Sequence, residues 1–180
     1  MRIHIQKSIP VLAGLGGGSS DAAATLHAVN LLAGDMLPKN QILDAAAELG
    51  SDVPFFASKA AFAIGRGRGD QLTEIPGPPS APALIVQPEF GVSTREAYES
   101  LAASRTNAKS PQPLEVPDYG FTDWPGIAEL SGNDFETVLF PELPQLRDLY
   151  SRLDSSSSLI TRLCGSGSAI IGIYSAISAR

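Results

Sequence analysis

The stretch of sequence that decides the fold is IPVLAGLGGGSSDAAATL, residues 9–26. Four of the five residues from Gly14 to Gly18 are glycines, two serines follow, and an alanine-rich run typical of a helix comes next. Glycine loses more conformational entropy on folding than any other residue, so a cluster is favourable only where side chains would be in the way. Two interpretations are open at this point: a flexible turn, or a loop whose main chain a ligand can approach.

The segments on either side of this loop predict a strand before it and a helix after it. Isoleucines alternate with polar residues in residues 1–9, which is the period of a strand. We expect Ser20 to be the N-cap of the helix, Asp21 to lie in its first turn and Gly34 to end it. A strand, a glycine-rich loop and a helix N-terminus form a favourable site for phosphate. The loop has neither the lysine of a Walker A motif nor the third glycine of the dinucleotide-binding motif.

The rest of the chain alternates helical and strand patterns, which predicts an α+β fold. Four prolines in residues 76–82 indicate a stiff connector, where we place a domain boundary. The expected elements are a helix at 38–49, strand-like segments broken by glycines within 51–75, a strand at 83–88, a helix at 93–104, a surface loop at 104–120, helical segments interrupted at Pro141 and Pro144 within 133–153, and two strands joined by a glycine-serine turn within 158–175.

Composition restricts the class of protein. A net charge of −6 and a pI near 4.8 give no electrostatic reason to expect nucleic-acid binding. A single cysteine, Cys164, excludes an intramolecular disulfide and suits a reducing compartment. We find no apolar run long enough for a membrane span and no signal-peptide pattern, so we expect a cytoplasmic protein without a membrane partner. His4 and His27 have no ligand-like companions, and we assign no metal site.

Several residues outside the loop have two interpretations each. Asp52 follows a helix end in LGSDVP, where an aspartate can form an Asx turn or a cap, before a valine that Pro54 holds extended. Residues 165–168 (GSGS) can form a plain hairpin turn. Tyr98 fits an aromatic of a helix face that packs on the core. Arg66 and Arg68, which lie between glycines, fit solvated residues better than phosphate ligands.

The complete string P-x-x-x-G-L-G-G-G-S-S-D-A-A resembles the ATP-phosphate loop of the galactokinase, homoserine kinase, mevalonate kinase and phosphomevalonate kinase (GHMP kinase) superfamily. The stretches LGSDVPFF, FGVSTREAY and LCGSGSAIIGIY match the same superfamily in order, and SGNDFE lies where it carries an Asn-Asp-aliphatic-Glu stretch. Together with IHIQKSIP, these motifs most resemble the members that phosphorylate the 2-hydroxyl of 4-diphosphocytidyl-2-C-methyl-D-erythritol in non-mevalonate isoprenoid biosynthesis. The resemblance covers nearly the whole chain.

The resemblance implies a fold, a cofactor and site residues. It implies a GHMP kinase fold, with a truncated ribosomal-protein-S5-like ATP-binding part at 1–78 and a ferredoxin-like part at 79–180. It implies ATP with Mg²⁺, a small-molecule substrate, Asp52 as the base that accepts the proton of the attacking hydroxyl, and Tyr98 stacked on the cytosine ring. The residues implied to bind ATP are Pro10, Val11, Leu12, Ala13, Gly14, Leu15, Gly16, Gly17, Gly18, Ser19, Ser20, Gly165, Ser166 and Gly167.

Some features depart from the pattern of the superfamily. Cys164 stands where the superfamily usually has Ser or Thr, and we interpret it as a small buried residue rather than a reactive thiol. Asp21 is interpreted as structural, with a Mg²⁺ ligand as the alternative. The Ala-Lys-aliphatic-Asn motif, whose lysine partners the catalytic aspartate, has no match, so we expect an internal fragment or a late start codon. The alternatives are another GHMP-type small-molecule kinase or a non-catalytic nucleotide-binding fragment. The oligomeric state is not predicted.

Overall fold

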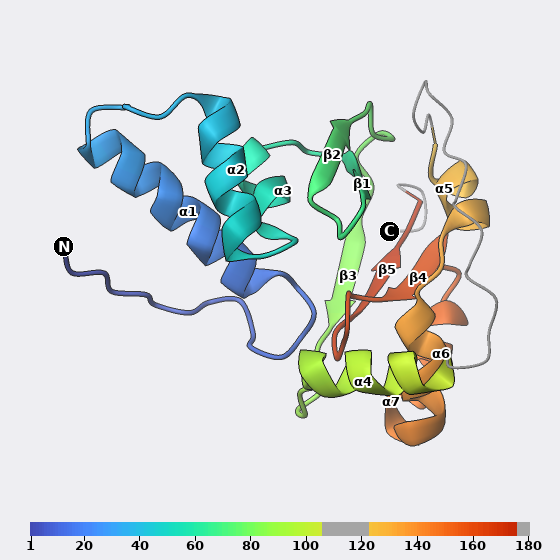
Figure 1. Ribbon diagram of the computed structural model, residues 1–180. Helices are drawn as coiled ribbons and strands as arrows, with labels where there is room; N and C mark the ends of the chain where they lie inside the picture. The colour runs from blue at the N-terminus through green and yellow to red at the C-terminus, as the bar shows by residue number, and fades with distance from the viewer. Residues whose placement is uncertain (106–122, 176–180) are drawn as a thin grey trace. The chain divides into compact units, whose positions relative to one another are not determined.

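The computed structural model describes residues 1–105 and 123–175 (Figure 1). The described chain forms two compact units. Unit 1 comprises residues 1–9 and 16–77, and unit 2 comprises residues 10–15, 78–105 and 123–175. The chain passes from unit 1 to unit 2 between Gly77 and Pro78, and the glycine loop is divided between the units at Gly16.

Unit 1 is a group of three helices followed by a hairpin. Its elements are α1 (Gly17–Leu32), α2 (Lys39–Leu49), α3 (Val53–Ser58), β1 (Ala63–Arg66) and β2 (Gln71–Glu74). The helices pack on one another around a small core (Figure 1) whose buried members are Ala23, Ile42, Ala46, Val53 and Ala57. β1 and β2 pair antiparallel, with Ala63 opposite Glu74 and Arg66 opposite Gln71. This confirms the predicted second helix and, for residues 63–74, the strand segments broken by glycines, whereas the helix α3 within 51–75 was not predicted.

The start of α1 differs from the prediction. Its N-cap is Gly16, with a left-handed φ of 67°, and Ser20 lies inside the helix, where its Oγ donates to the carbonyl of Gly17 at 3.0 Å. Asp21 is therefore not in the first turn. The prediction of Ser20 as N-cap was wrong because a glycine takes the left-handed conformation without strain, which lets the helix begin within the glycine run.

Two further predictions in unit 1 were wrong. Val53 is not extended but is the first residue of α3, because Pro54 in the first helical turn gives up an N–H that has no helical acceptor there. Residues 1–9 are not a strand: Ile3 and Ile5 are 54% and 53% exposed, and no strand among the described residues pairs with this segment. An alternating pattern produces a strand only where a partner strand and an apolar surface receive it.

Unit 2 is built on a three-stranded antiparallel sheet of order β3-β5-β4. Its elements are β3 (Ala83–Val86), α4 (Thr94–Ser104), α5 (Trp124–Leu130), α6 (Asp134–Glu142), α7 (Pro144–Asp154), β4 (Ile160–Leu163) and β5 (Ile170–Ile173). Helix α7 packs on β4 and β5, and α4 packs on α6. The core contains Val92, Ala97, Leu101, Val138, Leu139, Leu146, Leu153, Leu163 and Ile170.

Most of the elements predicted for unit 2 are confirmed. These are the strand at β3, the helix at α4, the two C-terminal strands and the helix break before Pro144. Pro141, expected to interrupt the helix, lies inside the last turn of α6, which ends at Glu142. α5 was not predicted, and most of the surface loop expected at 104–120 lies outside the described residues. No helix in the described ranges has the length and apolar character that crossing a membrane requires.

Candidate functional site

The first half of the glycine loop is held in unit 2 by backbone hydrogen bonds. The carbonyl of Leu12 accepts from the amides of Val92 (3.1 Å) and Ser168 (3.2 Å), and the carbonyl of Ala13 accepts from the amide of Ala169 (3.0 Å). Ala13 is 1% exposed. The structure thus brings the loop against the glycine-serine turn, residues 165–168, and the adjacent Ala169, about 150 residues further along the chain.

Two glycines make this close approach of main chains possible. Gly14 has a φ of +73°, and a Cβ on it would lie 1.8 Å from the carbonyl oxygen of Cys164. A Cβ on Gly165 would lie 3.0 Å from the carbonyl oxygen of Gly14. Residues 165–168 do form the turn between β4 and β5, but the contact with Gly14 shows that they are more than a hairpin connection.

Side chains from the β3–α4 segment also hold the glycine-serine turn. Ser166 Oγ lies 3.0 Å from Thr94 Oγ1. Ser168, which is fully buried, donates from Oγ to the carbonyl of Phe90 at 2.7 Å and accepts from Gln87 Nε2 at 3.1 Å. These bonds fix the orientation of the turn within unit 2.

The amides of this turn differ in availability. Gly167 donates its N–H to the carbonyl of Cys164 at 2.8 Å, so this amide is already used within the turn. Among the described residues, the amides of Gly165 and Ser166 have no such backbone acceptor. Burial raises the pKa of the Cys164 thiol to about 11, which keeps it protonated at neutral pH and supports its interpretation as an unreactive residue.

The second half of the loop forms the N-terminus of α1 in unit 1. The first helical hydrogen bond runs from the amide of Ser20 to the carbonyl of Gly16 at 2.9 Å, and no side chain caps the helix. The amides of Gly17, Gly18 and Ser19 therefore have no acceptor within the helix. A Cβ on Gly18 would meet nothing within 4 Å, so this end is open. Free amides at the positive end of a 16-residue helix fit an anion such as phosphate.

A lysine accompanies this helix end. Lys7 Nζ lies 3.3 Å from the point where a Cβ on Gly17 would stand, and it forms an ion pair with Asp21. The positive charge of Lys7 offsets the negative charge of Asp21, which reduces the repulsion between Asp21 and a bound phosphate. The ion pair is also a structural contact of Asp21, in line with its interpretation as a structural residue. Within the described ranges, no three His, Cys, Asp or Glu side chains gather as a metal site.

Asp52 is an exposed residue directly before α3. Its side chain makes no capping hydrogen bond to α3, so the interpretation of Asp52 as a helix cap was wrong. Its Oδ1 accepts a hydrogen bond from Ser51 Oγ at 3.2 Å. The carboxylate thus lies at the surface of unit 1, the unit that also contains the open end of α1.

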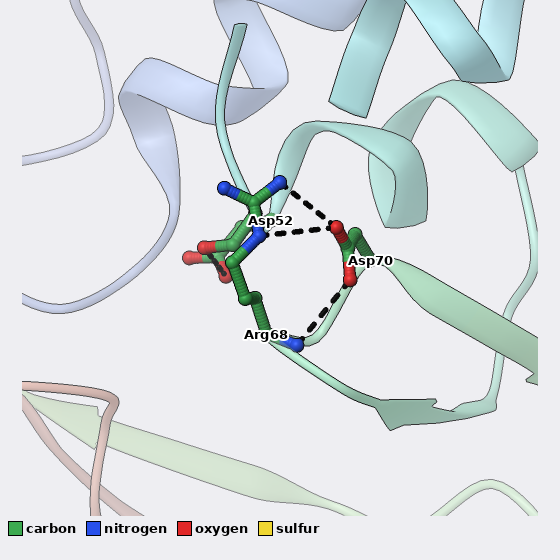
Figure 2. Close-up of polar contacts among 4 residues, drawn as sticks. Asp52, Arg68 and Asp70 are labelled. Atoms are coloured by element: carbon green, nitrogen blue, oxygen red, sulfur yellow. Dashed lines mark hydrogen bonds and ion pairs between the residues drawn. The ribbon is translucent and has the colours of Figure 1, made fainter. Parts of the chain in front are cut away.

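The β1–β2 hairpin turn lies beside the backbone of Ser51, since a Cβ on Gly69 would be 4.0 Å from the carbonyl oxygen of Ser51. Figure 2 shows Asp52 with this turn, in which Asp70 Oδ2 accepts from Arg68 Nη2 at 2.9 Å and from Nε at 3.3 Å. The hydrogen bonds from Arg68 lower the pKa of Asp70. Arg66 donates to Thr73 Oγ1 at 3.3 Å. Both arginines are exposed, as expected for solvated residues.

Tyr98 lies on α4 in unit 2 and is 59% exposed. Its ring meets Phe135 edge-to-face, with the ring centroids 4.9 Å apart and the planes at 84°. The residue is therefore not a core aromatic, and part of its ring surface is available to a flat ligand.

Two residues that the sequence reasoning did not assign lie at the glycine-serine turn. Asn133 Nδ2 donates to the carbonyls of Leu163 (2.8 Å) and Gly165 (2.7 Å), and Glu136 Oε1 accepts the amide of Leu163 at 2.9 Å. Both belong to the stretch SGNDFE, whose resemblance to the superfamily motif indicated that the stretch is important. The residue types alone do not indicate that Asn133 and Glu136 contact the glycine-serine turn.

Comparison with known proteins agrees with this architecture. Residues 1–60 match the GHMP kinases N terminal domain. A crystal structure of 4-(cytidine 5'-diphospho)-2C-methyl-D-erythritol kinase is similar over 97% of the chain and 62% of its own, with a TM-score of 0.72 and 31% identity. The chain has the GHMP kinase fold. A homoserine kinase from Cytophaga hutchinsonii supports this at the level of fold alone, with a TM-score of 0.64 and 18% identity over 96% of the chain and 60% of its own.

The sequence relatives carry a name chemically equivalent to that of the first structure. The 4-diphosphocytidyl-2-C-methyl-D-erythritol kinase of Moorella thermoacetica is 39% identical over 180 residues, and that of Chloroherpeton thalassium is 36% identical over 174 residues. These alignments cover 96% and 97% of the chain and 61% of each relative, so the chain spans about three fifths of the length of these relatives. The predicted α+β class and the resemblance to this superfamily are confirmed.

Proposed function

We propose that this GHMP kinase chain takes part in transferring the γ-phosphoryl group of ATP to the 2-hydroxyl of 4-diphosphocytidyl-2-C-methyl-D-erythritol, a small-molecule substrate, in the cytoplasm. The observation that carries the proposal is the open N-terminus of α1, with three amides that lack an acceptor among the described residues and a glycine that leaves space for a phosphate. The names of the relatives supply the substrate.

In this proposal each unit, taken by itself, has backbone amides that can bind phosphate. The amides of Gly17, Gly18 and Ser19, which have no acceptor within the helix, bind phosphate oxygens at the end of α1 in unit 1. In unit 2, the amides of Gly165 and Ser166, which have no backbone acceptor among the described residues, do the same. Mg²⁺ accompanies the phosphates and neutralises part of their charge. Residues 1–78 then correspond to the ATP-binding domain and residues 79–180 to the C-terminal domain.

Asp52 and Tyr98 are proposed to act on the second substrate. Asp52 accepts the proton of the attacking hydroxyl, since its carboxylate is exposed and is not used as a helix cap. Phosphoryl transfer depends mainly on positioning and charge stabilisation, so one well-placed carboxylate is sufficient for the proton. Tyr98 offers the exposed part of its ring to the cytosine, which requires only a flat aromatic surface.

A chimeric protein tests the proposal with this chain's own residues. Residues 1–180 replace the matching segment of the Moorella thermoacetica kinase, and circular dichroism establishes that the chimera is folded. We expect ADP formation that depends on the cytidyl substrate, and a phosphorylated product by mass spectrometry. A folded chimera that phosphorylates homoserine or mevalonate instead would overturn the substrate, and one that does not bind ATP would overturn the kinase function.

A further inference from the structure

The last residue of β4, Leu163, has both of its backbone polar groups bound by side chains from the N-terminus of α6. Its amide donates to Glu136 Oε1 at 2.9 Å and its carbonyl accepts from Asn133 Nδ2 at 2.8 Å. β4 is an edge strand of the described sheet, so these groups are not paired by a neighbouring strand on that side. The N-terminus of α6 therefore takes the place of the missing neighbour, directly before the glycine-serine turn.

Asn133 continues this contact into the turn itself. Its Nδ2 also donates to the carbonyl of Gly165 at 2.7 Å, so one amide group binds the carbonyls on both sides of Cys164. Its Oδ1 accepts the amide of Phe135 at 3.0 Å and caps α6. All three functions need two donors and one acceptor on a short side chain. Aspartate has no donor and serine has one, so asparagine is the residue type that the position requires.

We propose that Asn133 is a positioning residue that holds the Gly165–Gly167 turn in the conformation that binds the nucleotide phosphates. The proposal rests on the proposed function for the ligand. Gly165 has a φ of +49° and Gly167 of +83°, so the turn occupies backbone conformations that its own sequence does not select uniquely. Fixing the carbonyls of Leu163 and Gly165 sets the direction in which the chain enters the turn, and hence where the amides of Gly165 and Ser166 point.

The test compares Asn133→Ser with Asp123→Ser in the 180-residue chain. Serine keeps an oxygen that can cap α6 but cannot bind both carbonyls. The control makes the same kind of change at the N-cap of α5, where Asp123 Oδ1 accepts the amide of Gly126 at 2.8 Å. Hydrogen exchange of the Gly167 amide, which is bonded to the carbonyl of Cys164, reports on the turn without any ligand. We expect roughly 10-fold faster exchange in Asn133→Ser, the scale of one lost hydrogen bond, and no change in the control.

The second readout is nucleotide affinity. Calorimetry with Mg·ATP is expected to show about 10-fold weaker binding for Asn133→Ser and binding within about 2-fold for the control. In the chimeric kinase, the KM for ATP rises by a similar factor, whereas the KM for the cytidyl substrate stays unchanged. If Asn133→Ser does not fold, Asn133→Asp, which retains a strong cap, replaces it in the same comparisons.

The outcomes separate the two proposals. Unchanged Gly167 exchange overturns the positioning role of Asn133. Faster exchange with unchanged ATP affinity shows that Asn133 holds the turn for stability alone, which also overturns it. Absence of ATP binding by the unmodified chain overturns the proposed function instead, and with it the nucleotide role of the turn.

Discussion

Replacing Gly14 by alanine should destabilise unit 2 far more than the same change at Gly18, four residues further along the loop. At Gly14 the new Cβ would stand 1.8 Å from the carbonyl oxygen of Cys164 and 2.9 Å from the amide nitrogen of Gly167, both of them backbone atoms that cannot rotate away. The main chain must therefore separate there. At Gly18 a Cβ would meet nothing within 4 Å.

The magnitude follows from the contacts that this separation disturbs. A left-handed conformation costs a residue with a Cβ about 1–2 kcal/mol. Three backbone hydrogen bonds hold the adjacent carbonyls of Leu12 and Ala13, each with a net value of about 1 kcal/mol. We expect Gly14→Ala to lower the free energy of unfolding of unit 2 by about 2–5 kcal/mol. Gly18→Ala should change stability by at most about 1 kcal/mol, in the stabilising direction, because alanine favours a helix over glycine.

Urea unfolding followed by tryptophan fluorescence measures this effect. The chain has a single tryptophan, Trp124, which lies in unit 2 with its indole N–H bonded to the carbonyl of Pro79 at 2.8 Å. Its signal therefore reports on the unit that Gly14 disturbs. A Gly14→Ala variant as stable as Gly18→Ala would refute the reasoning, because it would mean that residues 12–14 do not pack on the glycine-serine turn.

Three further predictions concern binding, catalysis and pH. Gly17→Val should weaken Mg·ATP binding in calorimetry, because its Cβ would lie 3.0 Å from Ile9 and 3.3 Å from Lys7 Nζ, so the branched side chain crowds the free amides of α1; equal affinity would contradict a phosphate site there. Asp52→Asn in the chimeric kinase should keep ATP affinity and lower kcat by about 10² or more, whereas near-normal turnover would make Asp52 a structural residue. Burial, the largest effect, raises the pKa of Glu136 above its ordinary value of 4.5. The folded state therefore holds this proton more tightly, and stability falls as the pH rises from that value through the raised pKa. Glu136→Gln should remove this part of the pH dependence in urea unfolding from pH 4 to 8, and identical pH profiles would disprove it.

The predictions from sequence succeeded where local chemistry decides the outcome. The helix after Pro38, the break before Pro144 and the glycine-serine turn between two strands all follow from the backbone preferences of proline and glycine. The strand predicted for residues 1–9 failed because a strand depends on a partner that the local pattern does not contain. The prediction that Val53 is extended was also wrong. A residue before proline is usually extended, but here Val53 is the first residue of α3 and Pro54 lies in the first helical turn, where proline is favourable.

The candidate site shows the same division. The glycine run marks the loop because glycine is the residue that close approach requires, and it could be found from composition alone. Asn133 could not be assigned a role in this way, because its function depends on the carbonyls of Leu163 and Gly165, some 30 residues away. An asparagine at a helix N-cap is common, so its residue type indicates the cap and gives no information about the two additional acceptors.

The glycines of the loop look equivalent in sequence, but the structure gives them separate physical tasks. Gly14 allows one main chain to contact another, Gly16 turns the chain into α1 with a left-handed φ, and Gly18 leaves space at the free amides. A side chain at Gly14 should therefore act on stability, while one at Gly18 should act on any ligand at the helix end. If the loop were only a flexible turn, neither distinction would exist, because a mobile chain can accommodate a methyl group at any of these positions. An effect on stability at Gly14 and on ligand affinity at Gly18, within five residues, thus distinguishes a phosphate-binding loop from a flexible connection.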